Sequence, residues 1–340
     1  GVLHYRKDLM KRYGLCTCST PRCRALVLPV WDCDPPETWD ELERIAKVIQ
    51  DGERHATGNW EFHGLIFETM PYDGLAFRAL ELFASHADLA DPTLKSRGLD
   101  ADPWVLPNGE VVVNKNHAVS ALRRMARWPG FISPNSFTWW SDWRARDTFA
   151  RGEAVFLINW LSRVSSWNRP GSFLRDKVGV GRLPGVVPGL SRGTAAGCAY
   201  AISRSSDDPK AALAMVLSFI DHEAHVVKRN IDGPLLPARF DLAANLSSPI
   251  CIKPCDSCRS VCDVDVSGAY IIHRPCLATM PYYGIVAHTV ARLTGKVLGG
   301  SMAPEEAALG MECGILSILG RPEPERCRRW NPCGGGSERI

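Results

Sequence analysis

Asn159 and Trp160 are the residues whose position first suggests chemistry, because they stand at the carboxyl end of the apolar segment Ala154–Asn159. A short predicted helix ending at Gly152 precedes this segment, and its apolar side chains on both faces are typical of a central strand in a parallel sheet. In open α/β sheets, ligands bind beyond the carboxyl ends of such strands. An indole offers a flat apolar face and one N–H donor, which suits a sugar ring. Packing in the core is the competing interpretation of Trp160.

Thirteen cysteines are the second chemical feature of the chain. One group lies in segment 15–34, and in a second group Cys251, Cys255, Cys258 and Cys262 follow the spacing C-x3-C-x2-C-x3-C. Four thiolates this close could hold a tetrahedral zinc ion or pair as disulfides in an oxidising compartment. A paired zinc knuckle needs two C-x2-C hooks, and here only Cys255 and Cys258 form one. We therefore expect no metal site and no cofactor.

Composition and charge narrow the function classes. The 340-residue chain has a net charge of +3 spread along its length, which gives no electrostatic case for nucleic-acid binding. No apolar run approaches the roughly 18–20 residues that span a bilayer. The chain opens GVLHYRKDLM, without an initiator Met or a signal peptide, so we expect a fragment or a processed chain. His4, His55 and His63 fall on separate predicted elements, so an enzyme is the least favoured class.

Strands that alternate with helices predict an α/β architecture. The predicted strands are 2–5, 62–67, 154–159, 178–183 and 199–203, and a short helix after the first strand ends at Gly14. Further helices are predicted from residue 39 onward and at 73–85, 117–128, 208–219, 282–297 and 304–319. Thr38 and Glu41 form a capping-box pattern, and Pro107-Asn108-Gly109 predicts a hairpin turn.

Taken in order, these segments resemble the bacterial extracellular solute-binding proteins of family 1, the sugar receptors of ABC importers, and most of all the trehalose/maltose type. The order and spacing agree over nearly the whole chain. The matching pieces are GVLHYRKDLMKRYGL, PPETWDELERIAKVIQDG, GNWEFHGLIFE, YDGLAFRALEL, GFISPNS, FARGEAVFLINW, KVGVGRLPG, GCAYAISRSSDDPKAALAMVLSFI and RP…PYYGIV…VLGGSMAPEEAAL.

This resemblance implies a type II periplasmic-binding-protein-like fold with two α/β lobes, one nearly complete and the other truncated. The implied divisions are 1–195 as the second lobe, with a Cys-bearing insert at 15–34; 196–275 as a remnant of the first lobe, with an insert at 251–272; 276–320 as helices that pack back on the second lobe; and 321–340 as a disordered tail. Because the resembled family has neither insert, disulfides, metal binding and non-native coding such as a retained intron stay open as interpretations.

The chain departs from the family pattern in three places. The βα portion that opens family members, ahead of the strand starting at Gly1, is absent from this sequence. The family's Gly-Gly-Trp appears as Ala196-Gly197-Cys198, and Arg-Asn-Trp-Pro appears as Ile158-Asn159-Trp160-Leu161. These changes remove part of a cleft and one sugar-stacking aromatic.

By the resemblance, one set of residues lines the sugar-binding cleft. The set is Tyr72, Asp73, Asn159, Trp160, Gly197, Arg274, Tyr282 and Tyr283. Asp73 and Arg274 suit sugar hydroxyls because a charged partner strengthens a hydrogen bond. The alternatives are that Asp73 only caps a helix and that Arg274 only forms a surface ion pair. Tyr282 and Tyr283 cannot both face one pocket from adjacent helical positions.

The implied function is a receptor for a trehalose- or maltose-like oligosaccharide, located outside the cell or in the periplasm. Its partners would be the sugar and the permease subunits of an ABC transporter, with no contact to the membrane except through that transporter. The sugar would bind by hinge closure between the lobes, and no catalytic residue would be needed. The alternative is a truncated or degenerate homologue without a ligand, acting as an interaction or structural remnant.

Overall fold

A computed structural model of the chain describes residues 1–16, 33–90, 104–105, 110–195, 200–224, 271–273 and 282–330. Its centre is a four-stranded sheet with the order β2-β3-β1-β4. The strands are β1 (Val2–Arg6), β2 (His63–Ile66), β3 (Ala154–Asn159) and β4 (Val178–Gly181). Every residue of the four strands is buried, so helices and loops cover both faces of the sheet.

Strand β3 occupies the predicted central position, but the prediction of a parallel sheet is wrong. Strand β3 runs parallel to β2, with Leu65 opposite Phe156, and antiparallel to β1, with His4 opposite Leu157. The sheet is therefore mixed. The apolar run of β3 indicates that the strand is buried on both faces of the sheet. Such burial does not depend on whether the neighbouring strands run parallel or antiparallel to it.

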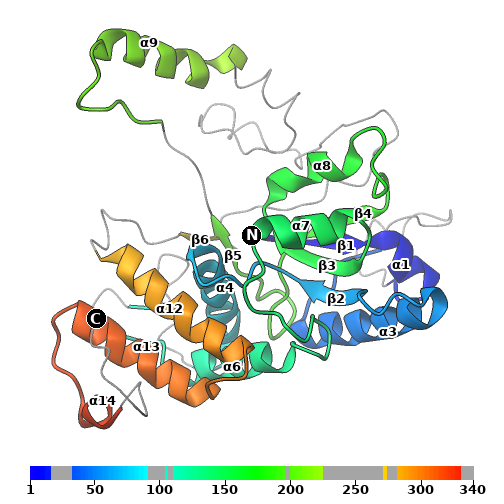
Figure 1. The fold of residues 1–340 in the computed structure, drawn as a ribbon, viewed down its shortest axis with the longest axis horizontal. Helices are drawn as coiled ribbons and strands as arrows, with labels where there is room; N and C mark the ends of the chain where they lie inside the picture. The colour runs from blue at the N-terminus through cyan, green and yellow to red at the C-terminus, as the bar shows by residue number, and fades with distance from the viewer. Residues whose placement is uncertain are drawn as a thin grey trace.

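Helices lie on both sides of this sheet (Figure 1). Helix α3 (Trp39–Thr57) packs against β2 and β3 on one side, and α7 (Asp142–Ala150) packs against β3 on the other. Short elements complete this part of the chain: α1 (Lys7–Arg12), η1 (Leu161–Arg163) and α8 (Val164–Asn168). The predicted cap of α3 is confirmed, since the Thr38 hydroxyl accepts a hydrogen bond from the Glu41 backbone N–H at 3.2 Å.

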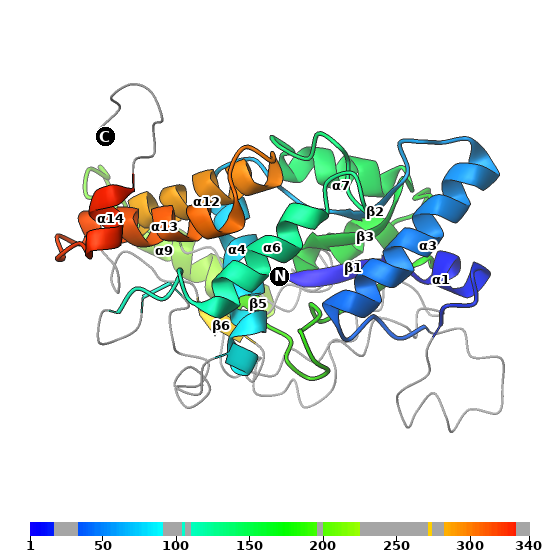
Figure 2. The same ribbon diagram turned by 90° about the horizontal axis from the view of Figure 1, so that it is seen from below.

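A bundle of four helices stands beside the sheet (Figure 2). It consists of α4 (Asp73–Ala90), α6 (Asn116–Arg127), α12 (Tyr283–Leu298) and α13 (Pro304–Ile318). Helix α12 contacts both α4 and α6, and α13 contacts α6, so helices from the last quarter of the chain pack with helices from its first half. Val105 and Val111 form an antiparallel bridge on either side of the predicted hairpin turn, and the turn itself, 106–109, lies outside the described residues.

The prediction of a disordered tail is wrong for its first half. Helix α14 occupies Glu325–Arg329, and Cys327 forms a disulfide with Cys313 of α13. Arg326 also pairs with Glu312 at 2.6 Å. A covalent link and a charge pair thus hold a segment whose polar composition gives no sign of order. Residues 331–340 lie outside the described part.

The remaining elements are β5 (Gly193–Ala195), β6 (Ile271–His273) and α9 (Pro209–Ile220). Strands β5 and β6 form a separate two-stranded parallel sheet. The predicted strand 199–203 is wrong over 200–203, which has no strand structure, because the pairing with β6 involves the earlier residues 193–195. Asp208 caps α9 as predicted, its carboxylate accepting from the Ala211 N–H at 2.9 Å.

Two further predictions concern the cysteines and the membrane. Cys16 and Cys33, at the edges of the first predicted insert, form a disulfide. The C-x3-C-x2-C-x3-C cluster lies outside the described residues. Within the described part of the chain, no helix is both long enough and apolar enough to cross a bilayer.

Candidate ligand-binding site beyond strand β3

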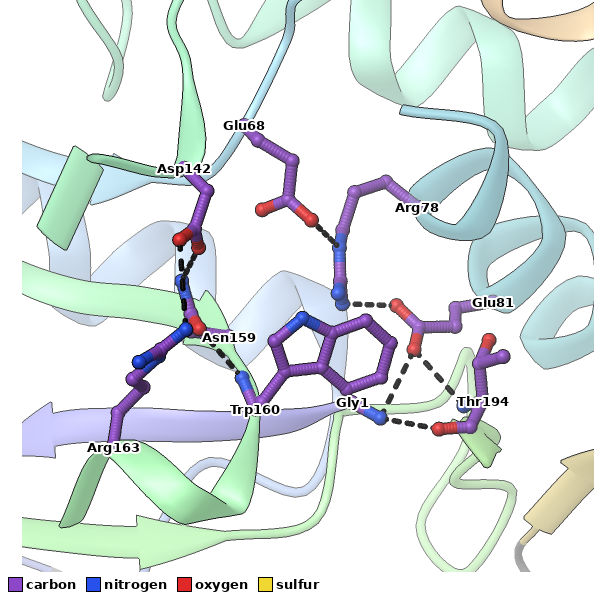
Figure 3. Close-up of polar contacts among 9 residues, drawn as sticks. All are labelled: Gly1, Glu68, Arg78, Glu81, Asp142, Asn159, Trp160, Arg163 and Thr194. Atoms are coloured by element: carbon purple, nitrogen blue, oxygen red, sulfur yellow. Dashed lines mark hydrogen bonds and ion pairs between the residues drawn. The ribbon is translucent and has the colours of Figure 1, made fainter. Parts of the chain in front are cut away.

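Trp160 follows β3 directly and lies at the centre of a cluster of polar side chains (Figure 3). Its indole is partly buried, with the Phe77 ring against it in an edge-on arrangement at 6.0 Å between centroids. The Arg78 guanidinium lies over the indole at 5.5 Å from the ring centroid. This indole is therefore held by packing and by a cation–π contact while part of it stays exposed.

Asn159 fixes the backbone of its neighbour and is itself buried. Its amide Nδ2 donates to the Asp142 carboxylate at 2.7 Å, and its Oδ1 accepts from the Trp160 backbone N–H at 2.7 Å. Asp142 stands in the first turn of α7, after Ser141, whose hydroxyl caps the helix. The Arg163 guanidinium lies 3.8 Å from the same carboxylate. Asn159 thus links the ends of β3 and α7, which makes it a positioning residue.

His4 of β1 forms a hydrogen bond with the backbone of Trp160. The Trp167 indole N–H donates to His4 Nδ1 at 3.2 Å, so Nδ1 is the acceptor and Nε2 carries the proton. This Nε2–H donates to the Trp160 carbonyl at 3.1 Å. Burial lowers the pKa of His4 to about 3, so the imidazole is neutral near pH 7.

A fully buried charge cluster forms the other flank of the site. The Arg78 Nε donates to Glu68 at 3.2 Å, and its Nη1 donates to Glu81. Burial raises the pKa of the Glu68 carboxyl. Among the described residues, Glu68 Oε2 and Arg78 Nη2 have no hydrogen-bond partner. One acceptor and one donor are therefore unpaired within this buried cluster.

Glu81 connects α4 to the strand that leaves the main sheet. Its Oε1 accepts from the Thr194 backbone N–H of β5 at 2.9 Å. The amino group of Gly1 lies 3.4 Å from the same carboxylate and donates to the Thr194 carbonyl at 2.6 Å (Figure 3). The candidate site thus reaches from β3, through α4, to the start of the two-stranded sheet.

Tyr72 lies over this cluster and is 39% exposed. A Cβ at Gly74 would come within 2.8 Å of both the Tyr72 ring and the Glu68 side chain, so these two side chains meet beside Gly74. Burial, with the negative charges of Glu68 and Asp142, raises the pKa of Tyr72 to about 12. Tyr72 is therefore a neutral phenol near pH 7.

Of the predicted set, the structure brings together Tyr72, Asn159 and Trp160 around the charge cluster, and it separates Tyr282 and Tyr283 from them. Gly295 of α12 lies over Leu75 and Pro71, at the beginning of α4. Tyr283 stands twelve residues earlier on α12, which corresponds to about 18 Å. Helix α12 therefore carries both tyrosines away from the beginning of α4, and Tyr283 contacts Trp104 instead.

The other predicted site residues differ in how deeply they are buried. Tyr283 is buried and stacks on Trp104 at 6.0 Å, whereas Tyr282 is half exposed, as expected for adjacent helical positions. Asp73 is exposed at the first residue of α4. Gly197 and Arg274 lie outside the described residues.

Six residues of this site were not predicted from the sequence: His4, Glu68, Arg78, Glu81, Asp142 and Arg163. Arg78 and Glu81 stand three residues apart inside the apolar run LAFRALEL, and two opposite charges within a buried helix face were a usable signal. The positions of Glu68 and Asp142 depend on pairing between distant segments, which no local pattern reports.

The arrangement offers groups for hydrogen bonding and stacking rather than a cluster of metal ligands. Within the described part of the chain, no group of His, Cys, Asp or Glu side chains could hold a metal ion. The site combines one aromatic face, charged donors on Arg78 and Arg163, and acceptors on Glu68 and Asp142. These groups suit a ligand with apolar faces and hydroxyl edges.

Comparison with known proteins gives consistent results. A family model described as bacterial extracellular solute-binding protein matches residues 1–222. A probable ABC transporter-binding protein of Deinococcus radiodurans is 28% identical over 321 residues, covering 94% of this chain and 67% of that protein.

Solved structures share the fold. Maltose-bound MalE3 of T. maritima superposes with a TM-score of 0.66 at 22% identity, covering 94% of this chain and 70% of that chain. A solute-binding protein from Thermotoga lettingae with bound α-D-tagatose gives a TM-score of 0.63 at 16% identity, with the same coverage. These likenesses confirm the predicted two-lobe α/β fold of the periplasmic binding proteins. The chain spans 70% of the length of both structures.

Proposed function

Because the chain belongs to the family of bacterial extracellular solute-binding proteins, we propose that it binds a sugar for an ABC importer. The proposed ligand is a trehalose- or maltose-like oligosaccharide. The solute-binding proteins of similar fold include ones solved with maltose and with α-D-tagatose, which supports a carbohydrate without choosing among sugars.

The observation that carries this proposal is the setting of Trp160. A partly exposed indole lies beside a buried guanidinium–carboxylate cluster. In this cluster, the donor Arg78 Nη2 and the acceptor Glu68 Oε2 have no partner among the residues that the structure describes. A pyranose stacks on an indole through its C–H face, and its hydroxyl groups can both donate and accept. Each hydrogen bond to a charged group contributes about 1.5–3 kcal/mol, compared with about 1 kcal/mol for a neutral pair.

The proposed mechanism is closure between two lobes. A sugar that contacts both lobes only in the closed form shifts the population toward that form. The permease subunits of the importer would then recognise the closed shape, and no bond in the sugar is broken. The proposed location is extracellular or periplasmic, and the Cys16–Cys33 and Cys313–Cys327 disulfides suit an oxidising compartment.

Isothermal titration calorimetry with maltose, trehalose, tagatose and mannitol tests the proposal. The wild-type chain is expected to bind at least one of these sugars, and Trp160→Ala is expected to weaken that binding about tenfold or more. Trp60→Ala serves as the matched control, because Trp60 is 63% exposed and lies outside the site. Equal affinities for the wild type and Trp160→Ala would count against the proposed site.

The alternative function is that of a homologue without a ligand, acting as an interaction or structural remnant. It is supported by Leu161, which stands where the resembled family has proline, and by Cys198, which stands where the family has a stacking tryptophan. Absence of binding to every sugar in the panel, by a chain that unfolds cooperatively, would favour this alternative.

A further inference from the structure

A cavity of about 560 Å³ lies at the other end of the main sheet from Trp160. It opens between α7 and the first residues of β2 and β3, where His63 pairs with Ala154. Trp160 follows the last residue of β3, so the length of the strand separates the cavity from the proposed sugar site. A volume of this size falls within the range of small-molecule sites.

Two buried rings, those of His63 and Trp140, line the cavity. The residues are 4% and 3% exposed, and their rings meet edge-on at 5.9 Å. Among the described residues, neither His63 Nδ1 nor Trp140 Nε1 has a hydrogen-bond partner. A buried polar atom without a partner costs about 1–3 kcal/mol and is rare in native proteins. Two residues that line this cavity therefore each carry a buried polar atom without a partner among the described residues.

Helix α7 provides a wall with an exposed aromatic face and a cation. Trp143 is 70% exposed, and the Arg146 guanidinium lies 4.2 Å from its ring centroid. The residue after Trp143, Arg144, lies over the Trp140 ring at 4.3 Å and forms no ion pair within the described part of the chain. An indole held by one cation and a second guanidinium free to donate are thus available to a ligand.

The charges around the cavity are of both signs. The lining includes two arginines, Arg144 and Arg151, and three carboxylates, and Arg151 pairs with two of them, Asp147 at 3.4 Å and Glu153 at 2.8 Å. The third carboxylate is Glu61. Burial lowers the pKa of His63 to about 4, so this imidazole adds no charge near pH 7. An ion of either sign would therefore meet like charges, whereas a neutral polyhydroxylated molecule would meet both donors and acceptors.

We propose that this cavity is a second binding site, separate from the one at Trp160, and that it takes a neutral carbohydrate. The ring of the sugar stacks on Trp143. Its hydroxyl groups accept from Arg144 and donate to Asp147 or Glu61.

The test uses the full chain labelled with 5-fluorotryptophan, titrated with maltose, trehalose or maltotetraose, and followed by fluorine NMR. In the Trp160→Ala variant, which retains the cavity, the Trp143 resonance is expected to shift saturably with at least one sugar. Trp143→Ala and Arg144→Ala are expected to weaken this second binding event about tenfold or more, as measured by calorimetry. Trp60→Ala, which removes an exposed tryptophan that does not line the cavity, is expected to leave it unchanged.

The proposal is overturned if the Trp143 resonance does not move in the Trp160→Ala variant, or if glucosamine or galacturonate binds the cavity more tightly than glucose. The two sites are distinguishable in this design. Binding lost only in Trp160→Ala would support the proposed function and contradict the second site. Binding lost only in Trp143→Ala would support the second site and contradict the one at Trp160.

Discussion

At Arg78, one guanidinium is shared between two carboxylates, Glu68 and Glu81, and all three side chains are buried. Removing the cation leaves buried Glu68 without a counter-charge and Glu81 with only the Gly1 amino group, which costs far more than the loss of an exposed ion pair. We expect Arg78→Met to lower the free energy of unfolding by about 3–5 kcal/mol, as measured by urea denaturation.

The matched control for Arg78→Met is Arg123→Met. Arg123 pairs with Glu305 at 2.5 Å on the surface, where an ion pair typically contributes about 0–1 kcal/mol. A triple variant that also carries Glu68→Gln and Glu81→Gln is expected to recover part of the loss, because it removes the unpaired charges together with the cation. Equal losses in the two single variants would contradict a buried, mutually dependent cluster.

His4 makes stability depend on pH. Its pKa is about 6.5 in the unfolded chain and about 3 in the folded chain, because burial disfavours the imidazolium. Between these values the unfolded chain binds more protons, so this contribution is complete above about pH 6.5 and is lost as pH falls toward 3. Protonation of Nδ1 would also remove the acceptor for the Trp167 indole N–H.

We therefore expect the stability of the wild-type chain to fall between about pH 7 and about pH 4, with a slope of at most about 1.4 kcal/mol per pH unit from His4. His4→Gln is expected to be less stable than the wild type at pH 7 and to show a shallower slope in urea unfolding at several pH values. The variant keeps some slope, because burial also lowers the pKa values of His63 and His86 to about 4. A slope as steep as that of the wild type would contradict the role assigned to His4.

At the scale of elements, the Cys313–Cys327 disulfide holds helix α14 against helix α13. The bridge closes a loop with a sequence separation of 14 and ties α14 to α13. We expect the Cys313→Ser/Cys327→Ser variant to lose about 3 kcal/mol of stability, since the bridge restricts the unfolded chain. Limited proteolysis should cut this variant near α14 first. An unchanged melting temperature and cleavage pattern would contradict this assignment.

Elements set by local signals were predictable from the sequence. Helix α3 follows from the Thr38 cap and its apolar period, and β3 follows from its apolar run. Helix α14 was missed because the disulfide that holds it joins two segments. The direction of β1 against β3 was missed because burial of a strand does not depend on the direction of its neighbours.

The residues of the candidate site also fall into two groups: those expected from the sequence, and those that only the packing of distant segments brings together. Trp160 could be proposed from the sequence because it follows a strand, whereas Tyr72 was expected in the cleft only from the family resemblance. Arg78 and Glu68 could not be paired beforehand, because α4 and the end of β2 must first pack together. Asn159 was expected to face the ligand, but its short bonds to Asp142 and to the Trp160 backbone assign it to positioning.

At the scale of the whole molecule, the order of segments along the chain predicted the fold better than any single motif did. The family pattern orders distant segments, and α12 packing on α4 is a long-range contact that no local periodicity predicts. The cysteine clusters lie where that pattern is interrupted, and the Cys16–Cys33 pair shows disulfide chemistry at the edges of the first interruption.

Helix α9 gives the whole molecule an exposed apolar surface. Leu213, Met215, Leu217 and Phe219 are 48%, 60%, 52% and 42% exposed, and they occupy more than one face of the helix. Lys210 is the single charged residue within α9. Apolar side chains gathered in this way promote association between molecules and binding of hydrophobic dyes.

We expect the chain to associate in a concentration-dependent way and to bind the dye ANS, as followed by light scattering and fluorescence. Met215→Glu/Leu217→Lys should reduce both signals without lowering the free energy of unfolding, since these side chains bury little surface. Ile285→Lys is the comparison variant, because Ile285 is a single residue that is 54% exposed on α12 and should change either signal little. If Ile285→Lys lowered dye binding as much as the double variant, or the double variant lowered it not at all, α9 would not be the source of association.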